Sequence, residues 1–151
     1  MKFKKILATL LMLGLATPAF CDTIGTVNYR KILENYSKAK TANSEIDDKA
    51  SELQRFLLDK ENEFKKIESP IQKKNFEDAT AKTFAAKQEA YAKFKEKKEM
   101  EIDTAIENAI KQVAMENKIN TVVDYRVIYF GGIDITDKVV KKLNMSGTAT
   151  K

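Results

Sequence analysis

The sequence between residues 46 and 71 reads IDDKASELQRFLLDKENEFKKIESPI, and this stretch decides the fold. Apolar side chains recur in it at alternating steps of four and three residues, which is the spacing of a coiled-coil seam. We therefore predict a long amphipathic helix that packs against a second helix. The predicted seam contains one charged member, Lys60, among Ile46, Ala50, Leu53, Leu57, Phe64, Ile67 and Ile71.

The second helix is predicted to follow the one proline of this region. Residues 38–118 contain no glycine, and strong helix formers dominate around the single proline, Pro70. The residue before a proline leaves helical geometry, whereas proline is favoured at the first helical position after a serine cap. We expect residues 38–118 to form a helical hairpin with its turn at residues 68–70.

The ascending half of this hairpin has a less regular apolar pattern. A continuous stripe appears only near its end, at Ile102, Ile106, Ala109, Ile110 and Val113. Earlier in the helix, aromatic residues stand between lysines and glutamines. We expect a well-packed base and a thin core toward the tip of the arm.

Short β-rich segments flank the hairpin on both sides. Residues 23–28 are predicted to form a strand that leads into a helical turn at residues 29–36. After the hairpin, residues 121–124 and 127–130 are predicted strands, and the glycine pair 131–132 ends the second one. Because the hairpin returns the chain to its start, these pieces should meet in one small body.

The C-terminal part is predicted to be a short helix and a tail. Asp134 and Asp137 can cap a helix over residues 138–143, and residues 145–151 have the composition of a frayed end. We favour capping over a calcium loop, since an EF-hand needs a 12-residue loop with further ligands. The glycine pair 131–132 is interpreted as a turn, because no lysine follows it at the spacing of a phosphate-binding loop.

The first 21 residues have the pattern of a cleavable secretion signal. Three lysines precede an apolar run over residues 6–15, which is too short for the roughly 20 residues of a membrane span. Cleavage before Asp22 is the favoured site, and cleavage after Ala19 is the alternative. Phe20 argues against a lipid on Cys21, since the residue before a lipidated cysteine is normally small.

Composition excludes most enzyme chemistry. Of the 151 residues 43% are hydrophobic and 32% charged, histidine is absent, and Cys21 is the only cysteine. The chain therefore has no imidazole base, no histidine- or cysteine-based metal site and no intrachain disulfide. We expect a binding protein without a cofactor or a metal. Three of the 27 basic residues lie in the signal, so the mature chain has an excess of only two over its 22 acidic residues and gives no reason to expect nucleic acid as a partner.

The predicted fold class is α+β, with a helical-hairpin arm projecting from a β-rich body made of residues 22–37 and 119–144. A body of about 50 residues buries too little surface to be stable alone. We therefore expect it to oligomerise through its apolar strand residues. These are Ile24, Val27, Val122, Val123, Ile128 and Phe130.

Four short segments in order give the chain a family resemblance. They are IGTVN at residues 24–28, KASELQR at 49–55, INTVVD at 119–124 and DIT at 134–136. With a helical arm between them and a signal before them, the chain resembles the Skp/OmpH family, the periplasmic chaperones of outer-membrane proteins. The resemblance covers essentially the whole mature chain.

The resemblance implies a function as well as a fold. It implies a homotrimer whose three arms surround a cavity in the periplasm, where unfolded outer-membrane polypeptides are held without ATP. It also brings peripheral contact with membrane lipid or lipopolysaccharide into consideration. A secreted structural coiled coil is the alternative, and it would form a rod with no cavity.

The arm departs from the family in its length and charge. It looks somewhat short, and residues 38–118 carry 17 basic and 17 acidic residues, whereas family members tend to have basic arms. The charge is segregated, because residues 60–98 hold 11 basic and 7 acidic residues. The distal half is thus positive by four and the base negative by four.

Client-binding residues are predicted on the arm. A helix face that mixes aromatics with lysine suits weak, adaptable contact with unfolded apolar chains. Core packing is the competing interpretation, which we prefer for Phe64 on the seam, whereas both stay open for the other rings. The candidates are Phe56, Phe84, Tyr91, Phe94, Lys93, Lys95, Lys97 and Lys98. We interpret Glu99, Glu101 and Asp103 as a solvated charged face rather than a carboxylate site.

Overall fold

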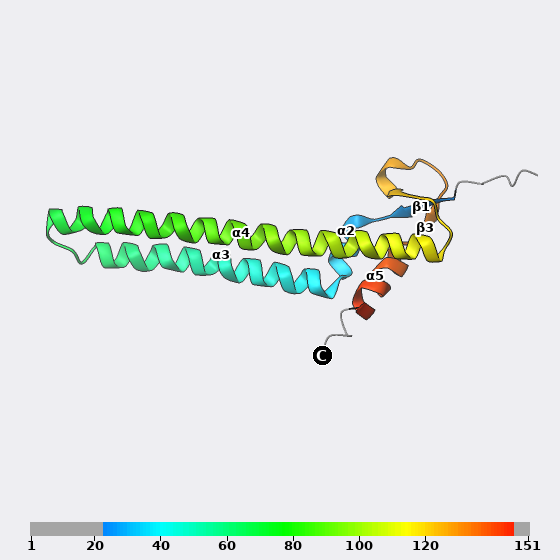
Figure 1. Cartoon of the computed structure of the whole chain (residues 1–151). Coiled ribbons are helices and arrows are strands. Elements are labelled where there is room, and N and C mark those ends of the chain that lie inside the picture. The colour runs from blue at the N-terminus through cyan, green and yellow to red at the C-terminus, as the bar shows by residue number, and fades with distance from the viewer. Residues whose placement is uncertain (1–22, 147–151) are drawn as a thin grey trace, which may run out of the picture.

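The structure is a computed structural model that describes residues 23–146. A long two-helix hairpin projects from a small body in which both ends of the described chain meet (Figure 1). The predicted α+β class is confirmed by these long helices and a three-stranded sheet. The expected signal at residues 1–21 and the end of the expected tail, residues 147–151, lie outside the described residues.

The arm consists of two antiparallel helices of unequal length. Helix α3 runs from Ser37–Phe64 and α4 from Pro70–Glu116, over 28 and 47 residues. At 1.5 Å per residue, α4 is about 70 Å long and reaches from the tip into the body. Pro70 begins α4 as predicted, although the side chain of Ser69 makes no capping hydrogen bond. The first helix ends at Phe64, earlier than expected, so Ile67 and Ile71 are not part of it.

The predicted seam is wrong at two positions, Leu57 and Ile71, and Ile71 has 74% of its surface exposed in the first turn of α4. Leu57 has 42% of its surface exposed, whereas Phe56 is half-buried and stacks on Phe84 of α4. A straight helix has 3.6 residues per turn, so a strict seven-residue repeat drifts around its axis. At this level of the arm the drift brings Phe56, not Leu57, to the partner helix.

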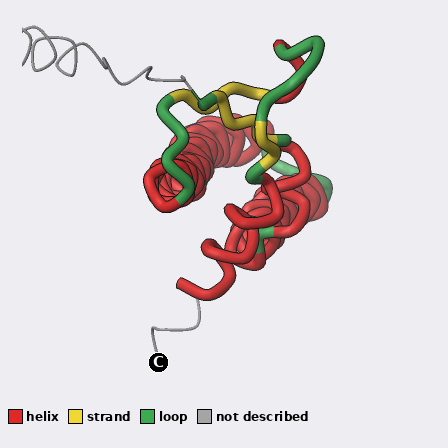
Figure 2. The backbone as a smooth tube through the Cα atoms, turned by 90° about the vertical axis from the view of Figure 1, so that its right-hand side faces the viewer, coloured by secondary structure: helices red, strands yellow, loops and turns green. Residues whose placement is uncertain are grey.

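The sheet of the body is entirely parallel. Strand β1, Ile24–Val27, lies in the centre, between β2, Thr121–Asp124, and β3, Ile133–Asp134. Gly25 is paired with Val122 on one side and with Ile133 on the other. Parallel pairing requires a long crossover connection, which the hairpin arm supplies between β1 and β2. Figure 2 shows the sheet above the arm, seen along the helices.

The predicted strand at residues 127–130 is not formed. A short 3-10 helix, η1, occupies Tyr125–Val127, and the chain then loops away from the sheet before β3 (Figure 2). The turn into β3 uses Gly131 and Gly132, whose φ angles are +89° and +90°. A Cβ atom at Gly132 would lie 2.8 Å from Cγ2 of Thr26, so glycine is required there. The short return to the edge of β1 therefore leaves residues 127–130 without a strand partner.

Two short helices complete the body. Helix α2, Tyr29–Asn35, matches the predicted helical turn, and α5, Thr136–Ser146, is longer than the predicted helix at residues 138–143. The amide of Asn144 donates to the carbonyl of Asn35 at 3.0 Å and its oxygen accepts from the Ser37 N–H at 3.0 Å. These contacts fix the last turn of α5 to the junction of α2 and α3.

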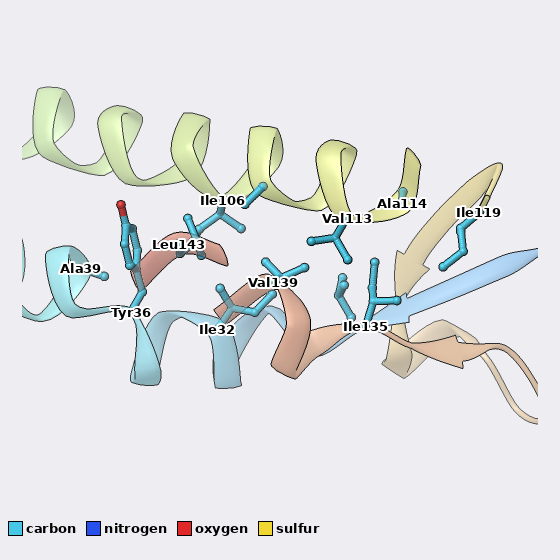
Figure 3. Close-up of a cluster of buried hydrophobic side chains, with 12 residues drawn as sticks. Ile32, Tyr36, Ala39, Ile106, Val113, Ala114, Ile119, Ile135, Val139 and Leu143 are labelled. Carbon is cyan, nitrogen blue, oxygen red and sulfur yellow. The ribbon is translucent and has the colours of Figure 1, made fainter. Parts of the chain in front are cut away.

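The hydrophobic core lies where α2, the base of α4, α5 and the sheet meet (Figure 3). The predicted apolar stripe on α4 is confirmed, since Ile106, Ala109 and Val113 are buried and Ile102 and Ile110 pack against the core. Most of the body is therefore held together by aliphatic side chains. The other buried members are Val27, Ile32, Tyr36, Ala39, Ala114, Ile119, Ile135, Val139 and Leu143.

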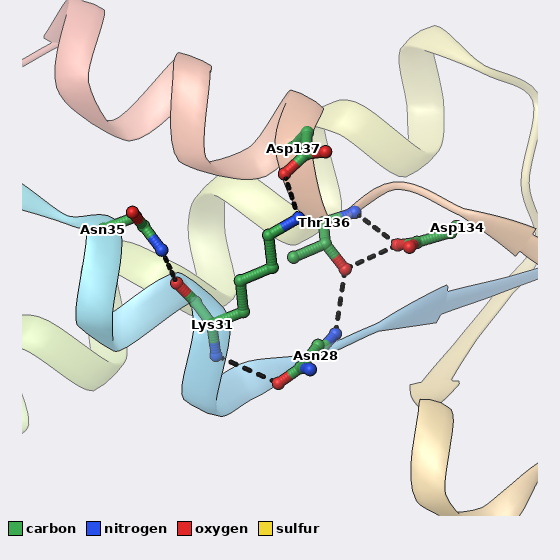
Figure 4. Close-up of polar contacts among 6 residues, drawn as sticks. All are labelled: Asn28, Lys31, Asn35, Asp134, Thr136 and Asp137. Carbon is green, nitrogen blue, oxygen red and sulfur yellow. Dashed lines mark hydrogen bonds and ion pairs between the residues drawn. The ribbon is translucent and has the colours of Figure 1, made fainter.

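A group of polar contacts joins β1 to the start of α5 (Figure 4). The hydroxyl of Thr136 accepts from the Asn28 N–H at 2.9 Å and donates to Asp134, which also accepts from the Thr136 N–H at 2.8 Å. Hydrogen bonds from the hydroxyl and the N–H of Thr136 lower the pKa of Asp134. Nζ of Lys31 lies 2.7 Å from Asp137. The predicted capping role of Asp134 is thus confirmed.

Candidate functional site

Four phenylalanines and three lysines form an aromatic–lysine cluster in the distal half of the arm. The rings of Phe56 and Phe84 are parallel, with centroids 6.5 Å apart and an interplanar angle of 2°. The rings of Phe64 and Phe76 lie 6.3 Å apart and are tilted by 40°. In each pair one ring belongs to α3 and the other to α4, so the two helices contact each other through aromatic side chains here. The cluster comprises Phe56, Phe64, Phe76, Phe84, Lys60, Lys73 and Lys87.

The lysines of this cluster lie over its rings. Nζ of Lys60 is 5.9 Å from the centroid of Phe56 and 5.5 Å from that of Phe76, and it is 2.7 Å from Glu63. Lys73 lies 5.4 Å from Phe64, and Lys87 lies 5.2 Å from Phe56. Each such contact is worth about 0.5–1 kcal/mol at exposed sites. The charged member of the predicted seam thus has ring and carboxylate partners.

An apolar groove of about 320 Å³ opens beside this cluster. Its walls come from both helices and include the half-buried rings of Phe64, Phe76 and Phe84. Leu57 turns its exposed side chain toward the same groove. The remaining lining residues are Lys60, Glu61, Glu77, Thr80 and Ala81.

Two of the predicted aromatic residues line a different groove, nearer the body. Tyr91 and Phe94 are half-buried on α4 and border a space of about 340 Å³. Lys98 lies 5.4 Å from the ring of Phe94. The structure therefore brings Phe56 and Phe84 together but separates them from Tyr91 and Phe94. The other lining residues of this second groove are Lys49, Glu52, Leu53, Lys87 and Ala90.

The four predicted lysines each have a carboxylate partner. Lys98 reaches across to Glu45 of α3 at 2.5 Å, and this hydrogen bond raises the pKa of Lys98. The others pair along α4 at distances of 2.6, 3.8 and 4.0 Å. This part of the arm is a mixed charged surface, which weakens its attraction for an acidic chain compared with unpaired lysines. The partners along α4 are Glu89 for Lys93, Glu99 for Lys95 and Glu101 for Lys97.

The predicted assembly residues fall into two groups. Val27 is buried with 6% of its surface exposed, and Val122 packs against the core of its own chain. Val123 and Ile128 are half-buried, and Ile24 is partly exposed. Phe130 has 98% of its surface exposed. Part of the predicted set thus serves the single chain, and the rest is available to another chain.

Sequence reasoning missed most of an apolar loop, which we define as residues 125–133. Tyr129 is fully exposed there, next to Phe130, and Val127 and Ile133 are also exposed. The signal is the run of four consecutive apolar residues at 127–130, which predicts a strand rather than an exposed loop. The exposed side chains of this loop form an apolar surface that the core of the body does not use.

The acidic residues of α4 lie in different surroundings. Asp103 accepts a hydrogen bond from the hydroxyl of Tyr29, and burial together with this contact raises the pKa of Tyr29 to about 12. Glu99 borders the same groove as Asp103, whereas Glu101 borders another one. Within residues 23–146 no group of three or more acidic or cysteine side chains could hold a metal ion. No helix among these residues is long and apolar enough to span a bilayer.

A family profile and curated relatives place the chain in one family. The sequence profile described as outer membrane protein (OmpH-like) matches residues 23–143. Proteins named chaperone protein Skp from Escherichia coli (strain K12) and Shigella flexneri are each 31% identical, over 89% of this chain and 92% of their own. A solved structure described as an OmpH-like outer membrane chaperone from Caulobacter crescentus CB15 covers 86% of this chain and 88% of its own, with 16% identity and a TM-score of 0.45. The profile match includes both the body and the arm.

Proposed function

Because the chain belongs to the OmpH-like family of outer membrane proteins, we propose that it is a holdase chaperone. It acts in the periplasm, where it holds unfolded outer-membrane proteins in a cavity between helical arms and prevents their aggregation. The Skp relatives, which are named as chaperones, support this assignment over nearly the full length of the chain.

The observation that carries the proposal is the incomplete burial of the arm. All residues from 43 to 105 are at least partly exposed, including every aromatic side chain among them. Two helices alone cannot cover rings on both sides of their interface, so apolar edges stay accessible between lysines. Such a surface makes many weak contacts with an unfolded chain. Together these contacts retain the chain, and each one breaks readily, so the chain can be released.

The proposed assembly is a homotrimer formed by the body. The small core supports one chain only marginally, and the apolar loop exposes Tyr129 and Phe130 for burial against a second copy. Three bodies joined in this way would place three arms around one cavity. After removal of the proposed signal, residues 1–21, no cysteine remains for a disulfide, so contacts between chains take over its stabilising role.

ATP independence and the absence of catalysis are part of the proposal. The sequence has no phosphate-binding loop, since no lysine follows the glycine pair 131–132 at the required spacing, and it has no nucleophile–base pair. Holding and release of the client are then proposed to need no nucleotide. Peripheral contact with membrane lipid or lipopolysaccharide is a further partner that we keep as a prediction.

The direct test is suppression of aggregation without nucleotide. An unfolded β-barrel outer-membrane protein is diluted from denaturant with and without the mature chain, and light scattering is followed. We expect suppression at a ratio of about three chains per client. Unchanged scattering together with a rod-like shape in small-angle X-ray scattering would instead support a structural coiled coil.

The residues that grip the client can be tested separately. Changing Phe84, Tyr91 and Phe94 together to Ser should weaken client binding at high salt, because apolar contact is not weakened by salt. The matched control changes Leu58, Ile71 and Met115 to Ser, which are exposed and border none of the grooves described above. If both variants bind the client with equal affinity, the three aromatic side chains serve only to pack the arm.

The contribution of charge to client binding is measured by varying the salt concentration. Client affinity should fall from roughly 0.05 to 0.5 M salt and reach a plateau, since charge attraction is screened beyond about 10 Å at 0.1 M. Changing Lys93, Lys95, Lys97 and Lys98 to Gln should flatten this dependence and slow association. An unchanged salt dependence in that variant would show that the charge effect arises elsewhere on the arm.

A further inference from the structure

A groove of about 600 Å³ lies at the base of the arm, between the ring of Tyr29 and one side of α4. Its apolar part is formed by Tyr29, Met100, Ile106 and Ile110, and Met100 has 60% of its surface exposed. A second hollow of about 360 Å³ shares Tyr29 with it. The two hollows therefore flank one aromatic side chain that is held in place by Asp103.

Carboxylates border this apolar surface along its whole length. Glu96, Glu99, Asp103 and Glu107 follow one another at steps of three, four and four residues, which places them on one side of the helix. No lysine or arginine lines the groove. The groove thus combines an apolar surface with four negative charges, in contrast to the distal half of the arm with its lysine-covered rings.

The charges are only partly neutralised by the chain itself. Glu99 lies 3.8 Å from Lys95 and Glu107 lies 3.5 Å from Lys111, in solvent-exposed pairs along α4. Exposed pairs of this kind are weak, so both carboxylates can exchange partners. Glu96 makes no ion pair among residues 23–146. A positively charged occupant would therefore meet available carboxylates beside apolar side chains.

We propose that this groove binds stretches of an unfolded client in which lysine or arginine alternates with apolar residues. The inference rests on the proposed function and names a second class of client segment for it. Charge complementarity selects the occupant: the basic side chains meet the carboxylates and the apolar ones contact Met100 and Ile110. The arm then offers two client surfaces of opposite character, the lysine-covered rings toward the tip and this acidic groove at the base.

Two synthetic peptides serve as probes, one of alternating Lys and Leu and one of alternating Glu and Leu. Their affinity for the mature chain is measured by fluorescence anisotropy at about 0.1 M salt, where the Debye length is about 10 Å. We expect the Lys/Leu peptide to bind about fivefold more weakly to the double variant Glu96→Gln, Glu107→Gln. The matched control, Asp78→Asn with Glu101→Gln, removes two charges from α4 outside the groove and should leave the affinity within about twofold of the parent.

The apolar part is tested with two exposed methionines of the same helix. Met100→Ser should weaken Lys/Leu binding severalfold, whereas Met115→Ser, at a site with 71% of its surface exposed outside the groove, should not. Equal effects of the groove and control variants would overturn the proposal, because binding would then reflect only the overall charge. Dissociation of the oligomer by Met100→Ser, seen by ultracentrifugation, would also overturn it and assign the groove to a second copy.

Failure of this inference is distinguishable from failure of the proposed function. Aggregation of an unfolded β-barrel protein is measured with the same variants. If the parent suppresses aggregation but shows no preference for the Lys/Leu peptide, the groove proposal is wrong and the chaperone proposal stands. If the parent suppresses no aggregation, the chaperone proposal fails, and the groove cannot then be a client site.

Discussion

The body and the distal arm hold together by different means. In the body, side chains such as Ile32 and Val139 are fully buried around one aliphatic core. In the arm, no residue from 43 to 105 is buried, and α3 and α4 meet through stacked rings and lysines that lie over them. One continuous helix, α4, passes through both environments. Helix formation itself therefore does not require a buried core along the whole length.

This difference has an energetic consequence. Full burial of an aliphatic side chain contributes about 1.5–3 kcal/mol, whereas an exposed cation–π contact contributes about 0.5–1 kcal/mol. The arm should accordingly open locally well before the body unfolds. In the proposed chaperone, a weakly held arm would adjust to clients of different size while the body would keep the chains together.

The largest effect is expected in the body core. Ile32→Ala removes a side chain with 0% of its surface exposed and should lower the free energy of unfolding by about 2–5 kcal/mol. Leu58→Ala, on the exposed side of α3, should change it by less than about 0.5 kcal/mol. Denaturant unfolding followed by circular dichroism measures both, and comparable losses would remove the distinction between body and arm.

A smaller effect is expected from the apolar loop, and it concerns assembly rather than folding. Phe130→Ser should preserve the helical signal of the chain but weaken trimer association about tenfold or more, since Phe130 would be buried only in the assembly. Sedimentation velocity over a concentration series measures this. Met115→Ser is the control. If the Phe130→Ser variant remains as trimeric as the parent, the assembly interface lies elsewhere, for example in the arms.

The arm should respond more mildly to loss of one cation. Lys60→Gln removes the charge between Phe56 and Phe76 and should cost about 0.5–1 kcal/mol of local stability. Hydrogen exchange should then speed up in α3 and α4 near the tip but not in β1. Lys66→Gln provides the exposed control. Exchange near Pro70 as slow as in the sheet would contradict the weak packing of the arm.

An effect confined to alkaline pH is expected at the junction of body and arm. The pKa of Tyr29 is raised from 10.0 to about 12, so the folded chain favours the protonated hydroxyl. Its contribution to stability is present below pH 10.0 and is lost as the pH rises toward about 12. Burial also raises the pKa of Tyr36, so an ultraviolet titration should show late transitions for both Tyr29 and Tyr36. Tyr29→Phe should remove one of these two transitions.

Much of the architecture could be predicted from local sequence. The hairpin, the start of its second helix at Pro70, the apolar stripe at the base of α4 and the helical turn after β1 all follow from periodicity and breaker residues. The candidate site could be predicted less well from the sequence. The contact between Phe56 and Phe84, which are 28 positions apart in sequence, depends on the register of α3 against α4, and no local pattern encodes that register.

The apolar run at residues 127–130 illustrates the same limit. β-propensity describes a side chain that fits a half-buried pleated surface, and the run satisfies that description. Whether a partner strand is available depends on the path of the chain. Here η1 turns the chain away from the sheet, and β3 begins only after Gly132 passes close to Thr26.

The sequence by itself determined the helices, the arm and the family, because repeats of three and four residues and short ordered segments act locally or as linear patterns. The tertiary structure decided which strands pair, which rings stack, which lysines lie over them and which carboxylates share a groove with Tyr29. These contacts join residues far apart in the chain. Their geometry depends on loop closure and on the packing of whole elements, so it is fixed only when the hairpin and the body come together.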